Sequence, residues 1–351
     1  MNTVIFQTGE TSVKETIQEC AKILKQGGLV AFPTETVYGL GGNGLDAKAS
    51  EKIYAAKGRP SDNPLILHIG KKEQLYDLVT EVPETAEKLM TAFWPGPLTI
   101  ILKKADIVPK ETSGGLSTVA VRMPSHPVAN ALLIEAGIPV AAPSANLSGR
   151  PSTTRASHVI EDLSGRVDAI IDGGDVPIGV ESTIVDLTGE VPMLLRPGFI
   201  TAEDIEKVIG PVETDRAIRK ESIIAHTNEV LHPKAPGMKY RHYAPKAPLT
   251  IVTGEAEKVA EAILKNTDDE TGILTLDEHR ELYSKGQILS VGSLKKPETV
   301  VHNLFDVLRQ LDEMNVRRIY SEDLTSCDTG EAVMNRLLKA AGGDYRKAEE
   351  L

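Results

Sequence analysis

The sequence predicts a two-domain α/β protein. At 351 residues the chain is longer than one typical domain. Short apolar runs of strand length and longer runs of helical period occur together in both halves of the chain. A proline-punctuated segment with little periodicity, residues 211–247, separates the two patterns. We therefore expect one α/β domain over residues 1–210, a linker over residues 211–247 and a second α/β domain over residues 248–351.

The first domain is predicted to hold more strands than helices. A capping box that begins at Ser12 predicts the first helix, and its apolar stripe consists of Val13, Ile17, Cys20, Ala21 and Leu24. Further helices are expected at residues 47–57, 126–136 and 154–163. Strands are expected at residues 29–32, 65–69, 98–103, 118–123, 139–142, 169–172, 183–187 and 193–195. Because these strands do not alternate strictly with helices, we expect a mixed, twisted sheet.

The second domain is predicted to be small, Rossmann-like and built on a parallel sheet. Its predicted strands and helices alternate along the chain, which is typical of parallel sheets with crossover helices. Strands are expected at residues 249–253, 272–276, 287–291 and 317–321, and helices at residues 255–265, 298–314 and 331–341. The linker before it combines prolines with Lys, Arg and His, and its length suggests a lid over a site.

Charge and cysteine content exclude several classes of function. A net charge of -11 argues against a sequence-independent coat for nucleic acid, whose affinity comes from basic side chains. Two cysteines, Cys20 and Cys327, form neither a disulfide framework nor a metal-ligand set, and we predict no protein ligands for a metal. The N-terminus lacks the features of a signal peptide, and no run approaches about 18 apolar residues. We expect a cytoplasmic protein that does not enter a membrane.

Two segments resemble phosphate-binding motifs to different degrees. Gly39–Gly44 satisfies the G-x-G-x-x-G pattern, but residues 33–38 separate it from the preceding strand, so a dinucleotide site is disfavoured. The segment with Lys57, Arg59 and Asn63 follows a predicted helix. It is either a solvated basic turn that complements the helix dipole or a phosphate clamp. The residues alone leave both interpretations open.

A strand arginine and several loops indicate an anion site. Arg122 shares one face of its predicted strand with the small residues Thr118 and Ala120, so it either reaches a sheet edge or binds an anion, and we favour the anion. His68 lies on an apolar strand, where a lone histidine is more often a core residue. Loops that combine glycine, hydroxyl groups and cations follow several strands, namely Pro143–Ser152, Gly179–Thr183 and Leu195–Gly198. Together these loops indicate a nucleotide site.

These motifs occur in the order found in a known family. They are Phe32–Leu40, Lys57-Gly-Arg59-Pro, Asn63-Pro-Leu, Trp94–Thr99, Val121-Arg122-Met-Pro and Ala142–Asn146. Over residues 14–210 the chain resembles the YrdC-like threonylcarbamoyl-AMP synthases. The segment Ala235–Pro245 and the second domain resemble the long, two-domain form of that family.

The resemblance implies a concave basic cavity over a twisted sheet and a specific reaction. The expected enzyme is a nucleotidyltransferase that makes threonylcarbamoyl-AMP and pyrophosphate from L-threonine, bicarbonate or CO2, and ATP, for threonylcarbamoyladenosine modification of tRNA. The implied L-threonine ligands are Thr36, His68, Arg122, Ala142 and Ser182. The implied ATP ligands are Lys57, Arg59, Asn63, Thr118, Ser144, Asn146, Ser152, Arg196 and Tyr243. The implied catalytic residues are Lys57, Arg59, Ser144 and Asn146.

The same resemblance sets expectations for cofactors and partners. Mg²⁺ is expected to arrive with ATP, with no organic cofactor. A downstream tRNA threonylcarbamoyl transferase complex is the expected partner, and direct contact with tRNA is left open. Two other functions remain as alternatives, a non-catalytic RNA-binding module and another carbamoyl or nucleotidyl transferase. The net charge and an aromatic content of 4% speak against RNA binding.

Overall fold

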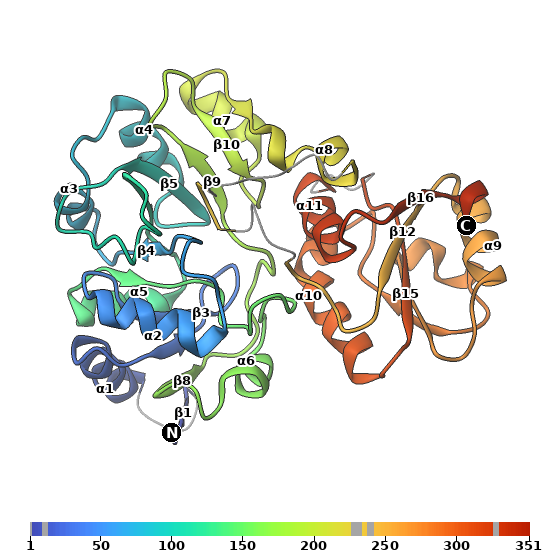
Figure 1. Ribbon diagram of the computed structural model, residues 1–351, viewed down its shortest axis with the longest axis horizontal. Helices are drawn as coiled ribbons and strands as arrows, with labels where there is room; N and C mark the ends of the chain where they lie inside the picture. The colour runs from blue at the N-terminus through green and yellow to red at the C-terminus, as the bar shows by residue number, and fades with distance from the viewer. Residues whose placement is uncertain (1, 9–12, 226–233, 237–241, 326–329) are drawn as a thin grey trace.

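The computed structural model describes residues 2–8, 13–225, 234–236, 242–325 and 330–351. It shows a larger N-terminal α/β domain beside a smaller C-terminal α/β domain, whose helices α10 and α11 lie on the side toward the larger domain (Figure 1). The two α/β units expected from the sequence are therefore present.

The N-terminal domain is built on a mixed sheet, as predicted. Within the described residues it has eleven strands in the order β1-β8-β2-β3-β7-β4-β6-β5-β9-β10-β11. Strand β6 pairs in parallel with β4 and antiparallel with β5. The strands are β1 (Val4–Gln7), β2 (Val30–Phe32), β3 (Gly39–Asn43), β4 (Ile66–His68), β5 (Leu98–Lys103), β6 (Thr118–Arg122), β7 (Val140–Ala141), β8 (Ala169–Asp172), β9 (Thr183–Asp186), β10 (Met193–Arg196) and β11 (Glu213–Thr214).

The four predicted helices of this domain are present, and three others were not predicted. The predicted ones are α1 (Val13–Lys25), α2 (Ala47–Lys57), α5 (Pro127–Ala136) and α6 (Ala156–Leu163), and the others are α3 (Leu75–Leu78), α4 (Glu84–Phe93) and α7 (Ala202–Ile209). Helix α1 buries Ile17, Cys20 and Leu24, which confirms its apolar stripe. Ser12, the start of the predicted capping box, lies outside the described residues.

The glycine-rich segment forms a central strand instead of a phosphate loop. Strand β3 pairs antiparallel with β2 and with β7. A Cβ on Gly41 would lie 2.8 Å from side-chain atoms of Phe32 and Val140, and one on Gly44 would lie 2.2 Å from Leu67. The glycines therefore allow neighbouring elements to pack closely against the strand.

The C-terminal domain has the predicted parallel sheet. Its strands are β12 (Leu249–Thr253), β13 (Thr271–Thr275), β14 (Gln287–Ser290), β15 (Arg318–Glu322) and β16 (Tyr345–Lys347), in the order β14-β13-β15-β12-β16. Every pairing between them is parallel. The helices are α9 (Ala256–Lys265), α10 (Pro297–Glu313) and α11 (Gly330–Ala340). Strand β16 was not predicted.

Part of the segment expected to be an unstructured linker is folded. Strand β11 pairs with β10, and helix α8 (Lys220–Ile224) follows it. Ala217, Ile218 and Ile223 are buried, so packing against neighbouring elements orders a segment whose own periodicity is weak. Residues 226–233 and 237–241 lie outside the described residues, so only residues 242–245 of the expected Met238–Pro245 lid can be described.

The two domains share a hydrophobic contact. Val37 and Val180 of the N-terminal domain belong to the same buried cluster as Leu304 and Phe305 of α10. Gly179 has a left-handed φ of 100°, and a Cβ there would lie 2.5 Å from the carbonyl oxygen of His302. Glycine at this position therefore allows α10 to approach the N-terminal domain.

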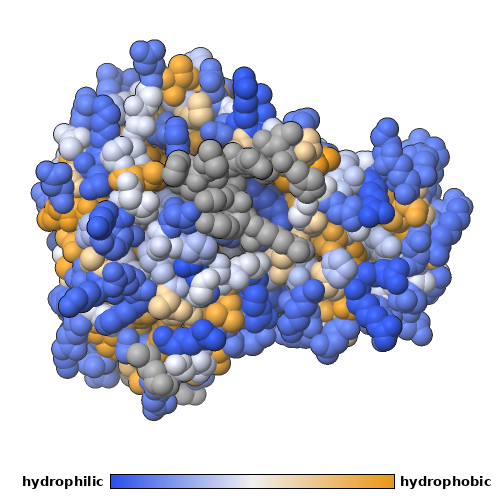
Figure 2. Space-filling view, in the orientation of Figure 1, coloured by the Kyte–Doolittle hydropathy of each residue, from blue (hydrophilic) through white to orange (hydrophobic). Residues whose placement is uncertain are grey.

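The surface shows no membrane-spanning element in the described residues, because none of their helices is long and apolar enough to cross a bilayer. On the face in Figure 2, hydrophobic residues are scattered among hydrophilic ones over both domains. Scattered exposed hydrophobic residues are ordinary on a folded protein.

Candidate functional site

A cationic cavity of about 700 Å³ lies in the N-terminal domain, where the described part of the linker covers the sheet. Lining residues come from β3, β4, β6, the loops after β7 and before β9, and the linker. The cationic lining side chains are Lys57, Arg59, Arg122, Arg150 and Arg196. Among the described lining residues, Glu181 is the one carboxylate. Such an excess of positive charge favours an anionic ligand.

Most of the predicted site residues meet in this cavity. Those in the lining are Thr36, Lys57, Arg59, His68, Arg122, Ala142, Ser144, Asn146, Ser182, Arg196 and Tyr243. They come from segments that are far apart in the sequence, so the fold assembles what the motifs only suggested. Three predicted residues, Asn63, Thr118 and Ser152, are not in the lining.

These three residues lie around the cavity. Asn63 is 2% exposed, and its side-chain oxygen has no hydrogen-bond partner among the described residues. Thr118 begins β6, four positions before Arg122. Ser152 is fully buried and donates to Glu181 Oε1 at 2.5 Å. The assignment of ATP binding to these three residues stays a prediction.

Arg122 lies at the end of β6 and is held in place by three neighbours. Its Nε donates to the Gly96 carbonyl at 3.2 Å, one terminal nitrogen donates to Thr36 Oγ1 at 2.9 Å, and the other lies 2.6 Å from Glu35 Oε1. Burial alone would raise the pKa of Glu35, but Arg122 outweighs it and holds that pKa below its usual value. The arginine is 4% exposed, so the sheet-edge interpretation is wrong.

His68 lines the cavity as a neutral imidazole. Burial, followed by the charge of Arg122, lowers its pKa to about 3. Its Nδ1 lies 3.2 Å from the carbonyl oxygen of Ile66. Because a carbonyl oxygen only accepts, Nδ1 carries the proton and Nε2 is left as an acceptor.

Lys57 and Arg59 follow from the way α2 ends. Gly58 takes a left-handed φ of 62° as the C-cap, and this turn separates the two cations. The Lys57 ammonium donates to the carbonyl oxygens of Ser144 and Asn146, and Arg59 donates to that of Pro64 at 3.1 Å. Burial, and secondarily the charge of Arg59, lowers the pKa of Lys57 well below its usual value. Lys57 is 2% exposed, so the solvated-turn interpretation is wrong for it.

Ser182 and Arg196 form a second buried pair. Arg196 donates to the carbonyl of Ser182 at 2.9 Å and to its Oγ at 3.0 Å. The Ser182 hydroxyl also lies 2.8 Å from Thr99 Oγ1. Burial lowers the pKa of Arg196 to about 10, and the group remains a cation at neutral pH.

The linker reaches the cavity through His242 and Tyr243. Tyr243 has a φ of 64° and packs its ring against Phe305 of α10 at a centroid distance of 5.2 Å. Burial raises its pKa to about 12. Burial, followed by the charge of Arg59, lowers the pKa of His242 to about 3. Both side chains are therefore neutral at pH 7.

Sequence reasoning missed the carboxylates that hold the cations. Glu35 stands inside the quoted Phe32–Leu40 motif, and Glu181 precedes Ser182, so both were visible next to predicted ligands. Asp162 and the C-terminal arginines Arg309 and Arg336 carried no local signal, because their roles depend on how the domains meet.

The described residues do not provide a site for a protein-bound metal ion. They contain no group of three or more His, Cys, Asp or Glu residues that could hold one. Glu181, the carboxylate nearest to a phosphate-binding role, is already paired with Arg336 at 3.0 Å. A magnesium ion at this site would depend on ligands other than protein carboxylates.

Fold and site together define a two-domain α/β protein that binds an anionic small molecule in a buried cationic cavity. Residues 22–198 match the family model Sua5_yciO_yrdC, described as telomere recombination, and residues 200–342 match the model described as threonylcarbamoyl-AMP synthase, C-terminal domain. The chain belongs to this Sua5/YciO/YrdC family, in its two-domain form, which confirms the resemblance found in the motifs.

Individual relatives match over nearly the whole chain. A threonylcarbamoyl-AMP synthase of Bacillus subtilis is 49% identical over 330 residues, 93% of each chain. One of Pyrococcus abyssi is 46% identical over 346 residues, 97% of this chain and 98% of the relative. The solved structure of P. abyssi Sua5 complexed with L-threonine superposes with a TM-score of 0.89 at 44% identity and covers 99% of both chains.

Proposed function

We propose that this protein is an L-threonylcarbamoyladenylate synthase, a nucleotidyltransferase that converts L-threonine, bicarbonate and ATP to threonylcarbamoyl-AMP, pyrophosphate and water. The observation that carries the proposal is the buried cavity, in which five cations face one carboxylate in the described lining. Such a cavity suits a triphosphate and an amino-acid carboxylate together. The names of the B. subtilis and P. abyssi relatives and the L-threonine bound to P. abyssi Sua5 support this choice of substrates.

The L-threonine subsite is proposed around Arg122. Its three neighbours use three of the five guanidinium N–H groups, so two remain for the substrate carboxylate. His68 Nε2 can accept a hydrogen bond from the amine or the hydroxyl of the substrate. Thr36 and Ser182 supply further hydroxyl groups, and the small Ala142 leaves room beside them.

The reaction requires positioning and charge neutralisation. The threonine amine forms a C–N bond with CO2 derived from bicarbonate, which gives an N-carboxylate. A carboxylate oxygen then attacks the α-phosphorus of ATP while the bond from that phosphorus to the bridging oxygen of pyrophosphate breaks. Lys57, Arg59 and Arg196 are proposed to neutralise the phosphates. Ser144 and Asn146 orient the nucleotide beside them.

Enclosure of the site suits an intermediate that loses CO2 easily. The linker residues His242 and Tyr243 lie against the cavity, and Tyr243 is 6% exposed. We propose that residues 211–247 act as a cover that keeps water from the N-carboxylate. Domain limits at residues 210 and 248 are proposed with it.

Magnesium and the downstream partner belong to the same proposal. Mg²⁺ enters with the triphosphate as part of the substrate, since the described residues offer no carboxylate set for it. The adenylate is an activated acyl donor that passes to a tRNA threonylcarbamoyl transferase in the cytoplasm. Direct contact between this chain and tRNA is not required by the chemistry.

The proposal is tested by product analysis. The purified chain is incubated with ATP, Mg²⁺ and bicarbonate, with and without L-threonine, and pyrophosphate and adenylate are measured by chromatography and mass spectrometry. An adenylate of the expected mass that depends on both L-threonine and bicarbonate is the expected result. A folded protein that binds ATP but makes no such product would refute the proposal and return RNA binding as the leading alternative.

A further inference from the structure

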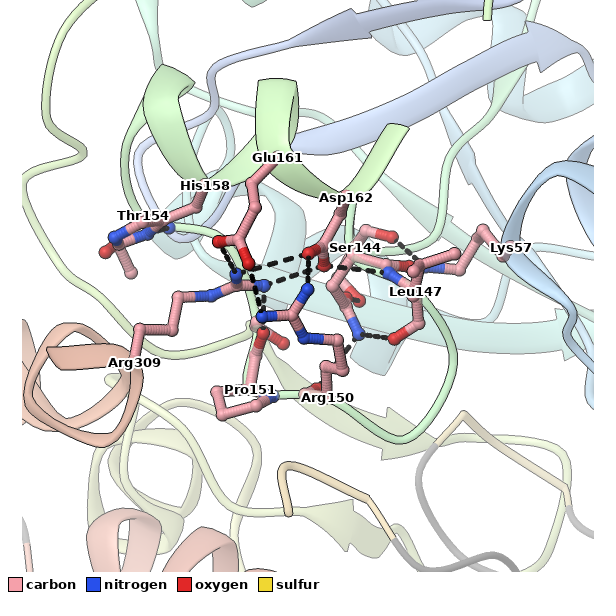
Figure 3. A network of polar contacts seen from close by, with 12 residues as sticks. Lys57, Ser144, Leu147, Arg150, Pro151, Thr154, His158, Glu161, Asp162 and Arg309 are labelled. Carbon is pink, nitrogen blue, oxygen red and sulfur yellow. Dashed lines mark hydrogen bonds and ion pairs between the residues drawn. The ribbon is translucent and has the colours of Figure 1, made fainter. Parts of the chain in front are cut away.

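The loop of residues 144–152 joins β7 to the segment before α6 and forms one wall of the cavity (Figure 3). Its first part is tied to Lys57, which donates to the carbonyls of Ser144 and Asn146. Asn146 Nδ2 donates to the carbonyls of Leu147 and Arg150, at 2.8 and 3.0 Å. The loop therefore has an internal framework that still needs an attachment at its distal end.

Asp162 of α6 provides that attachment. Its Oδ2 accepts from the backbone N–H of Leu147 at 3.0 Å, and its Oδ1 forms an ion pair with Arg150. The carboxylate side chain is 0% exposed, so water cannot stabilise its charge. Its position therefore depends on the cations around it.

One of those cations belongs to the other domain. Arg309 of α10 donates to Asp162 Oδ2 at 2.8 Å and to Oδ1 at 3.4 Å, and it also donates to the carbonyl of Pro151 at 2.7 Å. Its side chain is 2% exposed. Figure 3 shows the Arg309 and Arg150 guanidinium groups converging on the same carboxylate. A planar guanidinium can bridge a carboxylate and a carbonyl at once, which an ammonium cannot do with the same geometry.

We propose that Arg309 is a positioning residue, through which the C-terminal domain holds the 144–152 loop in the conformation that binds ATP. The inference rests on the proposed function, because it assigns this loop to the nucleotide. It gives the C-terminal domain a role in substrate binding without contact to a substrate. Loss of Arg309 leaves Asp162 with one cation fewer and frees the Pro151 carbonyl, so the loop loses its distal anchor.

The L-threonine subsite provides the internal comparison. Arg122 is held by Glu35, Thr36 and Gly96, all within the N-terminal domain and outside the 144–152 loop. An effect that acts through the loop should therefore weaken ATP binding and spare L-threonine binding. A general loss of structure would weaken both.

The test uses the full-length chain with R309K and R309M. The matched control is R155Q, because Arg155 joins the same two helices through Asp306 at 3.0 Å and has no contact with the loop among its ion pairs. Dissociation constants for ATP and for L-threonine are measured separately by calorimetry, and KM for ATP and kcat by adenylate formation. Circular dichroism checks folding.

We expect both Arg309 variants to bind ATP about 10- to 100-fold more weakly, as is typical of a small misplacement in a site, with L-threonine affinity within about twofold of wild type. R155Q should match the wild type for both ligands. KM for ATP should rise more than kcat falls. R309K should remain folded even if R309M does not, so it decides the question alone in that case.

Two results would overturn the inference. The first is unchanged ATP affinity in folded R309K, and the second is a parallel loss of both ligands. Failure of the proposed function is distinguishable, because it would show as absence of adenylate from the wild type, whereas the affinities are measured without turnover.

Discussion

Arg336 of α11 is fully buried between the domains, and its replacement by methionine should destabilise the protein strongly. Its Nε lies 3.0 Å from Glu181 Oε2, and it also donates to the carbonyl oxygens of Glu181, at 3.2 Å, and of Pro197. The methionine keeps most of the apolar volume and removes the charge. Glu181 would then remain as a buried carboxylate without its main cation.

The size of the effect follows from the environment of Glu181. Burial alone would raise its pKa, but Arg336, then Arg196 and the Ser152 hydroxyl, hold that pKa below its usual value. Removing one partner of such a buried pair costs about 3–5 kcal/mol of unfolding free energy. The double variant R336M/E181Q removes both charges and should recover at least about 1–2 kcal/mol of that loss.

The pH dependence gives the prediction a sign. In the wild type the folded pKa of Glu181 lies below its unfolded value of 4.5, so its contribution to stability is present above that pH and is lost as pH falls. In R336M the pKa should rise instead. The difference in unfolding free energy between wild type and R336M should therefore narrow as pH falls below about 4.5.

The assay is chemical unfolding followed by circular dichroism and by the fluorescence of Trp94, the single tryptophan of the chain. R317M serves as the matched control, because Arg317 pairs with Glu270 at 2.7 Å but is 74% exposed, and its loss should change stability little. The reasoning is refuted if R336M unfolds within about 1 kcal/mol of wild type, or if its defect does not depend on pH.

Three further predictions concern the cavity and the contact between domains. R122K should weaken L-threonine binding about 10- to 100-fold in calorimetry and spare ATP binding, because lysine cannot replace the three guanidinium contacts; equal affinity would contradict the subsite. His68 has a folded pKa of about 3 against 6.5 when unfolded, so its contribution to stability is present above pH 6.5 and lost as pH falls toward 3. H68N, whose amide can still donate to the Ile66 carbonyl, should therefore lower the slope of unfolding free energy against pH in this window by up to about 1.4 kcal/mol per pH unit, and an unchanged slope would count against the buried neutral imidazole. G179A should cost at least about 1–3 kcal/mol in thermal or chemical unfolding, because it combines a left-handed φ with a Cβ 2.5 Å from the His302 oxygen; an unaffected midpoint would mean that the domains meet differently.

The sequence predicted those features that depend on local pattern. Strand parity placed Arg122 on the same face as small residues, and the structure places it in the cavity wall. The alternating strands and helices of the second domain predicted its parallel sheet. In both cases the repeat of two or of 3.6 residues is a property of the backbone, so it can be read without knowledge of the partner surface.

Other features depend on what a segment meets after folding. Residues 39–43 are a central strand although glycine has low strand propensity, because Phe32 and Val140 need the space that side chains would fill. Arg309 lies beside the apolar stripe of α10, where helical periodicity would place a solvated cation. Only the approach of the N-terminal domain buries it against Asp162. The sequence therefore predicted ligand candidates better than the residues that position them.

The site follows one electrostatic plan in which buried carboxylates fix the cations that face the cavity. Glu35 holds Arg122, Asp162 holds Arg150, and Glu181 lies beside Arg196. Glu35 is neutralised from within its own domain, whereas Arg309 and Arg336 of the C-terminal domain neutralise Asp162 and Glu181. Because two of the three carboxylates depend on the second domain, separation of the domains would leave two buried anions behind the cationic wall. The attraction of that wall for phosphates would fall, so the docked C-terminal domain is part of what makes the cavity an ATP site.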